Sequence, residues 1–140
     1  MPELPVPRFD TFYRYGELTR LLFDYADAMP QLISVRSLGK SHEGRDIWVV
    51  AVTNSATGID TDKPAFWVDG NIHAAELTAS TACLYYLHQL ASGHGIDMEI
   101  TQLLDTRCVY LCPRLNPDGA ELALAERPRH IRSSTRRYPF

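Results

Sequence analysis

The apolar residues in the first third of the chain follow a helical spacing and then an extended one. From Asp10 onward they recur every three or four positions, which predicts a helix with one apolar face that ends near Pro30. Residues 31–39 alternate in part, and residues 46–52 are mostly apolar and β-branched. A polar, glycine-containing turn of six residues separates these two stretches, so we expect an antiparallel hairpin.

The middle of the chain alternates between strand-like and helix-like stretches. Residues 65–68 have the pattern of a buried strand, and a glycine turn leads from them into an apolar segment that predicts a helix over about residues 76–92. Residues 97–104 fit a short helix whose first residue is its N-cap, and residues 106–112 fit another strand. Strand, helix and strand predict a right-handed crossover with parallel strands. We therefore expect an α/β fold: a mixed parallel and antiparallel sheet with helices on both faces.

The length of 140 residues fits one domain, residues 1–140, in which three early prolines make residues 1–9 an extended arm. No window is apolar enough to span a membrane, and no secretory signal is visible at the start. The three cysteines are odd in number and form no C-x-x-C motif. We interpret them as reduced packing residues and expect a cytoplasmic protein.

Charge is distributed unevenly along the chain. The net charge is −3, but residues 127–140 hold five arginines and no acid, so residues 1–126 carry nine basic and seventeen acidic side chains, a balance of −8. An arginine-rich end can bind nucleic acid, yet the rest is acidic and no base-stacking motif accompanies it. We expect neither nucleic acid nor a membrane as partner. Arginines can instead hold carboxylates or stabilise a developing oxyanion.

Candidate chemistry begins directly after the strand at residues 65–68. His73 and Glu76 follow the turn at Gly70, at the carboxyl edge of the sheet, where open α/β folds place their ligands. If the first helical turn starts between them, the two side chains share a face and can converge on a zinc ion. The alternative is a histidine that caps the strand and a glutamate that is favoured by the helix dipole.

A second motif, Asn116-Pro-Asp-Gly119, follows the strand at residues 106–112 and therefore lies on the same edge. Alone it predicts only a tight turn. Together with residues 39–47, residues 70–76 and residues 129–132, in this order, it resembles the first half of a zinc metallocarboxypeptidase of the M14 type.

This resemblance implies that His73 and Glu76 are two of three protein ligands of Zn²⁺, as in the His₂Glu site of carboxypeptidase A, with water in the open position. Zinc would lower the pKa of that water to about 7 and polarise the scissile carbonyl. The resemblance also implies that Arg132 stabilises the oxyanion and that Arg129 lines a substrate subsite. The expected substrate is the C-terminus of a peptide or protein. Arg127 or Arg136 takes either role if the preceding loop has a different length.

The sequence also departs from the family pattern. The family's third ligand, a histidine, is not found: His88 lies about 18 Å along the helix from Glu76, His94 lies farther, His42 sits on the hairpin turn, and His130 stands between arginines.

The substrate-gripping Asn-Arg pair, the pocket tyrosine and the general-base glutamate are missing too, and Ala75 stands where an arginine is often found. We expect a truncated chain that is inactive or nearly so by itself. The alternative function is a non-catalytic α/β interaction module, with homo-oligomers formed through an exposed sheet edge.

Overall fold

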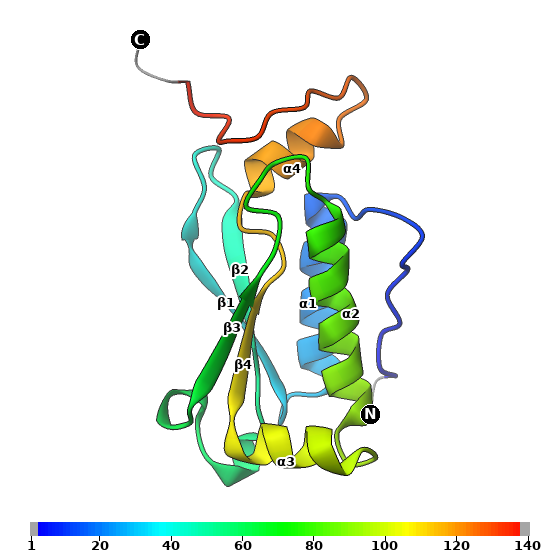
Figure 1. Cartoon of the computed structure of the whole chain (residues 1–140), viewed down its shortest axis with the longest axis vertical. Coiled ribbons are helices and arrows are strands. Elements are labelled where there is room, and N and C mark those ends of the chain that lie inside the picture. Colours follow the sequence, from blue (N-terminus) through cyan, green and yellow to red (C-terminus); the bar gives the residue numbers. More distant parts are fainter. Residues whose placement is uncertain (1–2, 138–140) are drawn as a thin grey trace.

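The computed structural model describes residues 3–137 and contains one four-stranded sheet with strand order β1-β2-β4-β3 (Figure 1). The expected hairpin is confirmed, since β1 (Ile33–Lys40) pairs antiparallel with β2 (Asp46–Val52). β2 also pairs antiparallel with β4 (Cys108–Cys112), which pairs in parallel with β3 (Ala65–Asp69). The mixed sheet predicted from the sequence is therefore present.

Two long helices, α1 (Tyr15–Ala28) and α2 (Thr78–Gly93), cover the same face of this sheet (Figure 1). The core lies between them and the sheet, and it includes the fully buried side chains of Leu22, Tyr25, Val50, Val52, Leu84, Leu87, Leu90, Val109 and Leu111. Within residues 3–137 no α-helix covers the other face, which carries Arg36 stacked on the Tyr110 ring. The expected arrangement of helices on both faces is thus not seen in this part of the chain.

The first helix begins later than its apolar pattern predicts. Side chains fix its start: the amide of Arg14 donates to the Glu17 carboxylate at 2.7 Å, and the amide of Tyr15 donates to the Glu121 carboxylate at 2.8 Å. These contacts satisfy amides that a helix N-terminus leaves without partners. The short helix α3 (Met98–Thr106) has the expected cap, because the Asp97 carboxylate accepts from the amides of Glu99 and Ile100.

β3 is not the buried strand that its apolar residues predict. It forms an edge of the sheet, and the side chains of Phe66 and Trp67 are 62% and 46% exposed. The short 3₁₀ turns Ser55–Thr57 and Asp60–Asp62 precede it. Sequence pattern alone predicts an apolar strand, whereas burial depends on what lies beside the strand.

The second motif begins a helix rather than forming only a tight turn. α4 (Pro117–Ala123) starts with proline at its first position, and the Asn116 side chain caps it by accepting from the amide of Gly119 at 3.0 Å. The three cysteines are free and buried, as expected for packing residues. None of the helices in residues 3–137 combines the length and apolar character that crossing a bilayer requires.

Candidate metal centre

The candidate site is built on the loop that joins β3 to α2. Gly70 begins this loop, and a Cβ there would lie 2.7 Å from the carbonyl oxygen of Ala79, so only glycine fits. Asn71 follows with a φ of 56°, a left-handed conformation that asparagine adopts more readily than most residues. Its buried side chain donates to the carbonyl oxygens of His73 (2.8 Å) and Ala74 (3.1 Å). The loop is therefore held from inside by its own side chain.

His73 and Glu76 converge, but they do not lie in the first turn of a helix as their spacing predicts. α2 begins only at Thr78, and the pair lies in a turn in which the Glu76 amide donates to the His73 carbonyl oxygen at 3.1 Å. This turn brings Nδ1 of His73 to 2.8 Å from Oε2 of Glu76. The two side chains meet at the carboxyl end of β3, as the position of the motif predicts.

Arg132 is the third member of this cluster. Its Nη1 lies 3.2 Å from Oε1 of Glu76, and its backbone carbonyl oxygen accepts from the amide of Ala74 at 3.1 Å. The hydrogen bond with His73 is the main cause that lowers the pKa of Glu76 below its usual value, and the charges of His73 and Arg132 lower it further. Glu76 is therefore ionised at neutral pH. The side chains of His73, Glu76 and Arg132 are 37%, 54% and 72% exposed, so solvent reaches all three.

A hollow of about 210 Å³ lies against this cluster, and it is lined by His73, Ala75, Glu76, His130, Ile131 and Arg132. His130 was set aside from the sequence because arginines flank it, yet it lines the same hollow as the two candidate ligands. Even so, no group of three or more His, Cys, Asp or Glu side chains within residues 3–137 is arranged to hold a metal ion.

The chemistry of the donor pair fits a zinc ion in part. An imidazole nitrogen and a carboxylate oxygen are both zinc ligands, and ligands of a tetrahedral zinc with bonds of about 2.0–2.1 Å lie about 3.3 Å apart. The observed separation of 2.8 Å requires a small opening, which two half-exposed side chains can provide. Residues 3–137 thus offer two converging protein ligands and an open side.

The other candidate arginines lie apart from Glu76. Arg129 is exposed and anchors its segment through its amide, which donates to the carbonyl oxygen of Leu122 at 3.2 Å. In the described part of the chain, neither Arg127 nor Arg136 forms an ion pair with Glu76, whereas Arg132 does. Within the described residues, Arg132 is thus the candidate arginine that contacts Glu76, and the roles of Arg132 and Arg129 stay predictions.

Asn116 is a positioning residue that sequence reasoning missed. Its Nδ2 donates to the carbonyl oxygens of Ile72 (3.3 Å) and Ser133 (3.1 Å), so it joins the loop of His73 to the segment of Arg132. Gly119 packs against the same loop, because a Cβ at this position would lie 2.4 Å from the Cβ of Ala74. The motif was visible in the sequence, but its contacts to distant residues were not.

Asp118 connects the tip of the β1–β2 hairpin to α4. Its buried carboxylate accepts from the Ser41 hydroxyl (2.7 Å), the Glu43 amide (2.9 Å) and the Arg45 guanidinium (2.8 Å). Burial alone would raise the pKa of Asp118, but these hydrogen bonds outweigh it and lower the pKa. This junction joins residues of two motifs that are more than seventy positions apart in the sequence.

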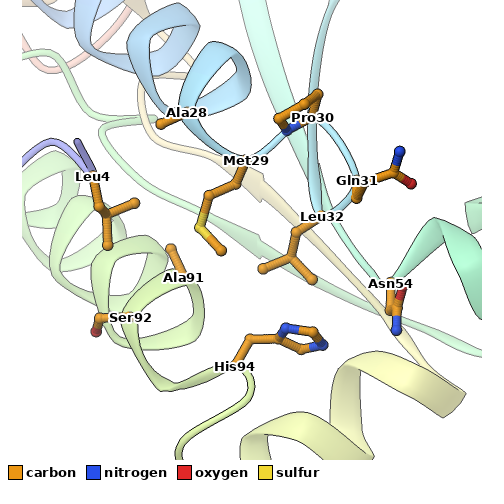
Figure 2. Close-up of a pocket in the computed structure, with 10 residues that line it drawn as sticks. All are labelled: Leu4, Ala28, Met29, Pro30, Gln31, Leu32, Asn54, Ala91, Ser92 and His94. Atoms are coloured by element: carbon orange, nitrogen blue, oxygen red, sulfur yellow. The ribbon is translucent and has the colours of Figure 1, made fainter. Parts of the chain in front are cut away.

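A second, larger hollow lies elsewhere. It has a volume of about 490 Å³ and is lined mostly by apolar residues between the C-terminal ends of α1 and α2, among them Leu4, Met29, Leu32 and Ala91 (Figure 2). His73 and Glu76 precede the other end of α2, so this hollow is separate from the candidate site.

The thiols of Cys83 and Cys112 have pKa values raised by burial to about 11 and about 12. Both thiols are therefore protonated at neutral pH.

Comparisons with protein families and with known proteins point to the same family. The family model for zinc carboxypeptidases matches residues 18–138. A zinc carboxypeptidase of Saccharothrix mutabilis subsp. capreolus is 31% identical over 109 residues, which cover 78% of this chain and 24% of that protein. Carboxypeptidase A2 of Rattus norvegicus is 33% identical over 111 residues, covering 79% and 25% respectively. The chain thus spans about a quarter of the length of these two relatives.

Solved structures agree with the sequence matches. The crystal structure of a carboxypeptidase A from Helicoverpa armigera has a TM-score of 0.77 and 28% identity, with 91% of this chain and 30% of that chain covered. Thrombin-activatable fibrinolysis inhibitor has a TM-score of 0.83 at 21% identity, with 94% and 32% covered, which supports the fold.

Proposed function

Because the chain belongs to the zinc carboxypeptidase family, we propose that its candidate site serves the hydrolysis of a peptide bond at the C-terminus of a peptide or protein. The observation that carries this proposal is the meeting of His73 Nδ1, Glu76 Oε2 and the Arg132 guanidinium at the carboxyl edge of the sheet. In a single cluster it combines two zinc-ligand types and one fixed cation.

Each residue has a separate role in this proposal. His73 and Glu76 would hold the metal, which supplies a Lewis acid for the scissile carbonyl and a more acidic water. Asn71 and Asn116 would keep the ligand loop in place, because both bond to its carbonyl oxygens. Arg132 is mostly exposed and anchored through its backbone, so its guanidinium can turn from Glu76 toward a carbonyl oxygen on which negative charge develops.

A second candidate function is a non-catalytic α/β module that retains the fold. One observation favours it: the described residues 3–137 bring together two metal ligands, not three. The two candidates differ in what they require of His73 and Glu76. A module needs no metal there, whereas a peptidase does.

Metal binding by the whole 140-residue chain tests the proposal directly. We expect one equivalent of Zn²⁺ to bind in competition with a chromophoric chelator, and Co²⁺ to give a visible absorption band. His73→Ala and Glu76→Gln should each weaken binding at least about tenfold. His42→Ala is the matched control, because His42 is exposed on the hairpin turn. Equal zinc affinity in all four proteins would exclude the site and favour the module.

Hydrolysis of a peptide from its C-terminus is the second readout. Even at the low rate expected of this chain by itself, the wild type loaded with zinc should release the terminal residue faster than the same chain with Glu76→Gln. If the wild type binds zinc and shows no release, the peptidase activity of this chain is rejected while the metal site stands.

A further inference from the structure

The arginine-rich segment crosses the end of the molecule at which the candidate site lies (Figure 1). Four of its side chains flank Arg132, and we call this set the arginine rim: Arg127, Arg129, Arg136 and Arg137. All four residues are exposed, and within residues 3–137 none of them forms an ion pair. The segment that carries Arg132 past the site therefore holds four further exposed arginines.

The acidic side chains around the rim are already engaged by other partners. Glu76 pairs with Arg132, and Glu121 pairs with Arg14 at 2.7 Å. Glu43 and Asp118 both pair with Arg45, at 2.6 and 2.8 Å. Because two carboxylates share Arg45, one negative charge is left over there, and the exposed Glu126 adds a second, against the four arginines of the rim. The rim consequently keeps a positive charge that its surroundings do not neutralise.

Hydrogen bonds of its backbone hold the arginine-rich segment in place relative to the site. The Arg129 amide bonds to Leu122 of α4, the Arg132 carbonyl oxygen accepts from Ala74, and the Ser133 carbonyl oxygen accepts from Asn116. From Arg129 to Arg137 the segment spans at most roughly 28 Å, since an extended chain advances about 3.3–3.6 Å per residue. This is the length of about eight residues of an extended peptide.

We propose that the arginine rim binds acidic side chains of the substrate, so that the site is selective for peptides with several Asp or Glu residues near their C-terminus. This inference rests on the proposed peptidase function. Guanidinium groups bind carboxylates through two parallel hydrogen bonds, and an uncompensated positive rim also attracts anionic chains from a distance. The substrate's own carboxylates would supply the partners that the rim lacks.

One feature favours an acidic peptide over nucleic acid. The other part of the chain, residues 1–126, has a balance of −8, which repels a long polyanion that extends beyond the rim. A short acidic peptide contacts the rim alone and avoids this repulsion.

Binding of labelled peptides to the whole chain tests the proposal without catalysis. One decapeptide carries four Glu residues before its last two residues, and its partner carries four Gln residues instead. With EDTA present, so that no metal contributes, we expect fluorescence anisotropy to show at least about tenfold tighter binding of the Glu peptide at 50 mM salt. The preference should fall below about twofold at 500 mM salt, because salt screens exposed charges.

Variants locate the binding surface. Arg136→Gln combined with Arg137→Gln should remove most of the preference for the Glu peptide. Arg107→Gln should retain it, because Arg107 is an exposed arginine just before β4, at the opposite end of that strand from the site. Equal binding of the two peptides, or a preference that the double variant leaves unchanged, would overturn the proposal.

A single-stranded oligonucleotide of the same net charge is the third probe. If it binds more tightly than the Glu peptide, the rim recognises polyanions in general, and selectivity for acidic peptides is rejected. Because these measurements contain no metal, failure of the zinc site would leave them unaffected, and the two proposals can fail separately.

Discussion

The Nδ1 atom of His73 lies 2.8 Å from Oε2 of Glu76, although neither residue belongs to a helix. Their approach depends on the turn before α2, and that turn depends on Asn71 within the loop and on Asn116 and Arg132 outside it. The candidate ligands are therefore positioned by a network of hydrogen bonds to backbone carbonyl oxygens and amides. Changes at residues that never contact a metal should alter metal affinity.

Asn71 offers the first such test. Asn71→Ala removes two hydrogen bonds from a buried side chain and leaves a β-carbon in the left-handed region, so we expect a loss of about 2–3 kcal/mol in the free energy of unfolding. Asn71→Gly loses the same bonds but avoids the backbone cost, and should be about 1 kcal/mol more stable than Asn71→Ala. Urea denaturation measures both values. A glycine variant less stable than the alanine variant would contradict the role assigned to the backbone at this position.

Gly119 tests the packing of α4 against the ligand loop. In Gly119→Ala the new Cβ would lie 2.4 Å from the Cβ of Ala74, so α4 or the loop must move, at a cost of about 1–3 kcal/mol. Gly16→Ala is the matched control, because Gly16 is in α1 and a Cβ there has no neighbour within 4 Å. The control should leave the unfolding free energy unchanged or raise it by up to about 1 kcal/mol. Equal effects of the two substitutions would show that the close contact is unimportant.

Contacts between residues that are distant in the sequence explain which parts of the site the sequence could not reveal. The positions of His73 and Glu76 at the sheet edge followed from a strand, a glycine and a helix in order, all of which are local patterns. The pairing of Arg132 with Glu76 depends on a hydrogen bond between Ala74 and Arg132, which lie 58 positions apart, and no local pattern contains it. No local pattern therefore distinguishes Arg132 from its neighbouring arginines.

Burial was predicted less well than secondary structure for a related reason. The partial alternation of residues 31–39, the apolar and β-branched run of residues 46–52 and the N-cap at Asp97 are properties of neighbouring residues, and these elements form as expected. β3 has an equally apolar sequence, yet Phe66 and Trp67 remain exposed because, within the described residues, β3 lies at an edge of the sheet. An apolar strand sequence indicates that the strand tends to be buried. Whether it is buried depends on which other residues pack against it, and these can be distant in the sequence.

Asp118 should make the stability of the hairpin tip depend on pH. Its pKa is lowered in the folded state, so its ionised form stabilises the fold at neutral pH, and this contribution is lost as the pH falls below the ordinary value of 3.8 and through the folded pKa. We expect Asp118→Asn to lower the free energy of unfolding by about 1–3 kcal/mol at pH 7.

The same difference should shrink as the pH falls below 3.8, because the unfolded chain then takes up a proton at this carboxyl and the advantage of the ionised form in the folded state diminishes. Denaturation curves of both proteins between pH 3 and pH 7 provide the measurement. Asp62→Asn serves as the control for the loss of one exposed carboxylate, since Asp62 is exposed. A difference between wild type and Asp118→Asn that stays constant over this range would rule out the stabilising role of the ionised carboxylate.

The exposed edge strand leads to a prediction of self-association. Within residues 3–137, β3 pairs with β4 alone, so its other side presents unpaired backbone groups next to the exposed Phe66 and Trp67. Such an edge pairs readily with another strand unless a charge or a covering segment blocks it. We therefore expect the weight-average mass in sedimentation equilibrium to rise above the 15.8 kDa of the monomer as the concentration increases.

Phe66→Lys should suppress this rise, whereas Ile96→Lys, which adds the same charge at an exposed residue between α2 and α3, should not. A mass that stays monomeric at all concentrations, or equal suppression by both lysines, would show that the edge does not associate in this way.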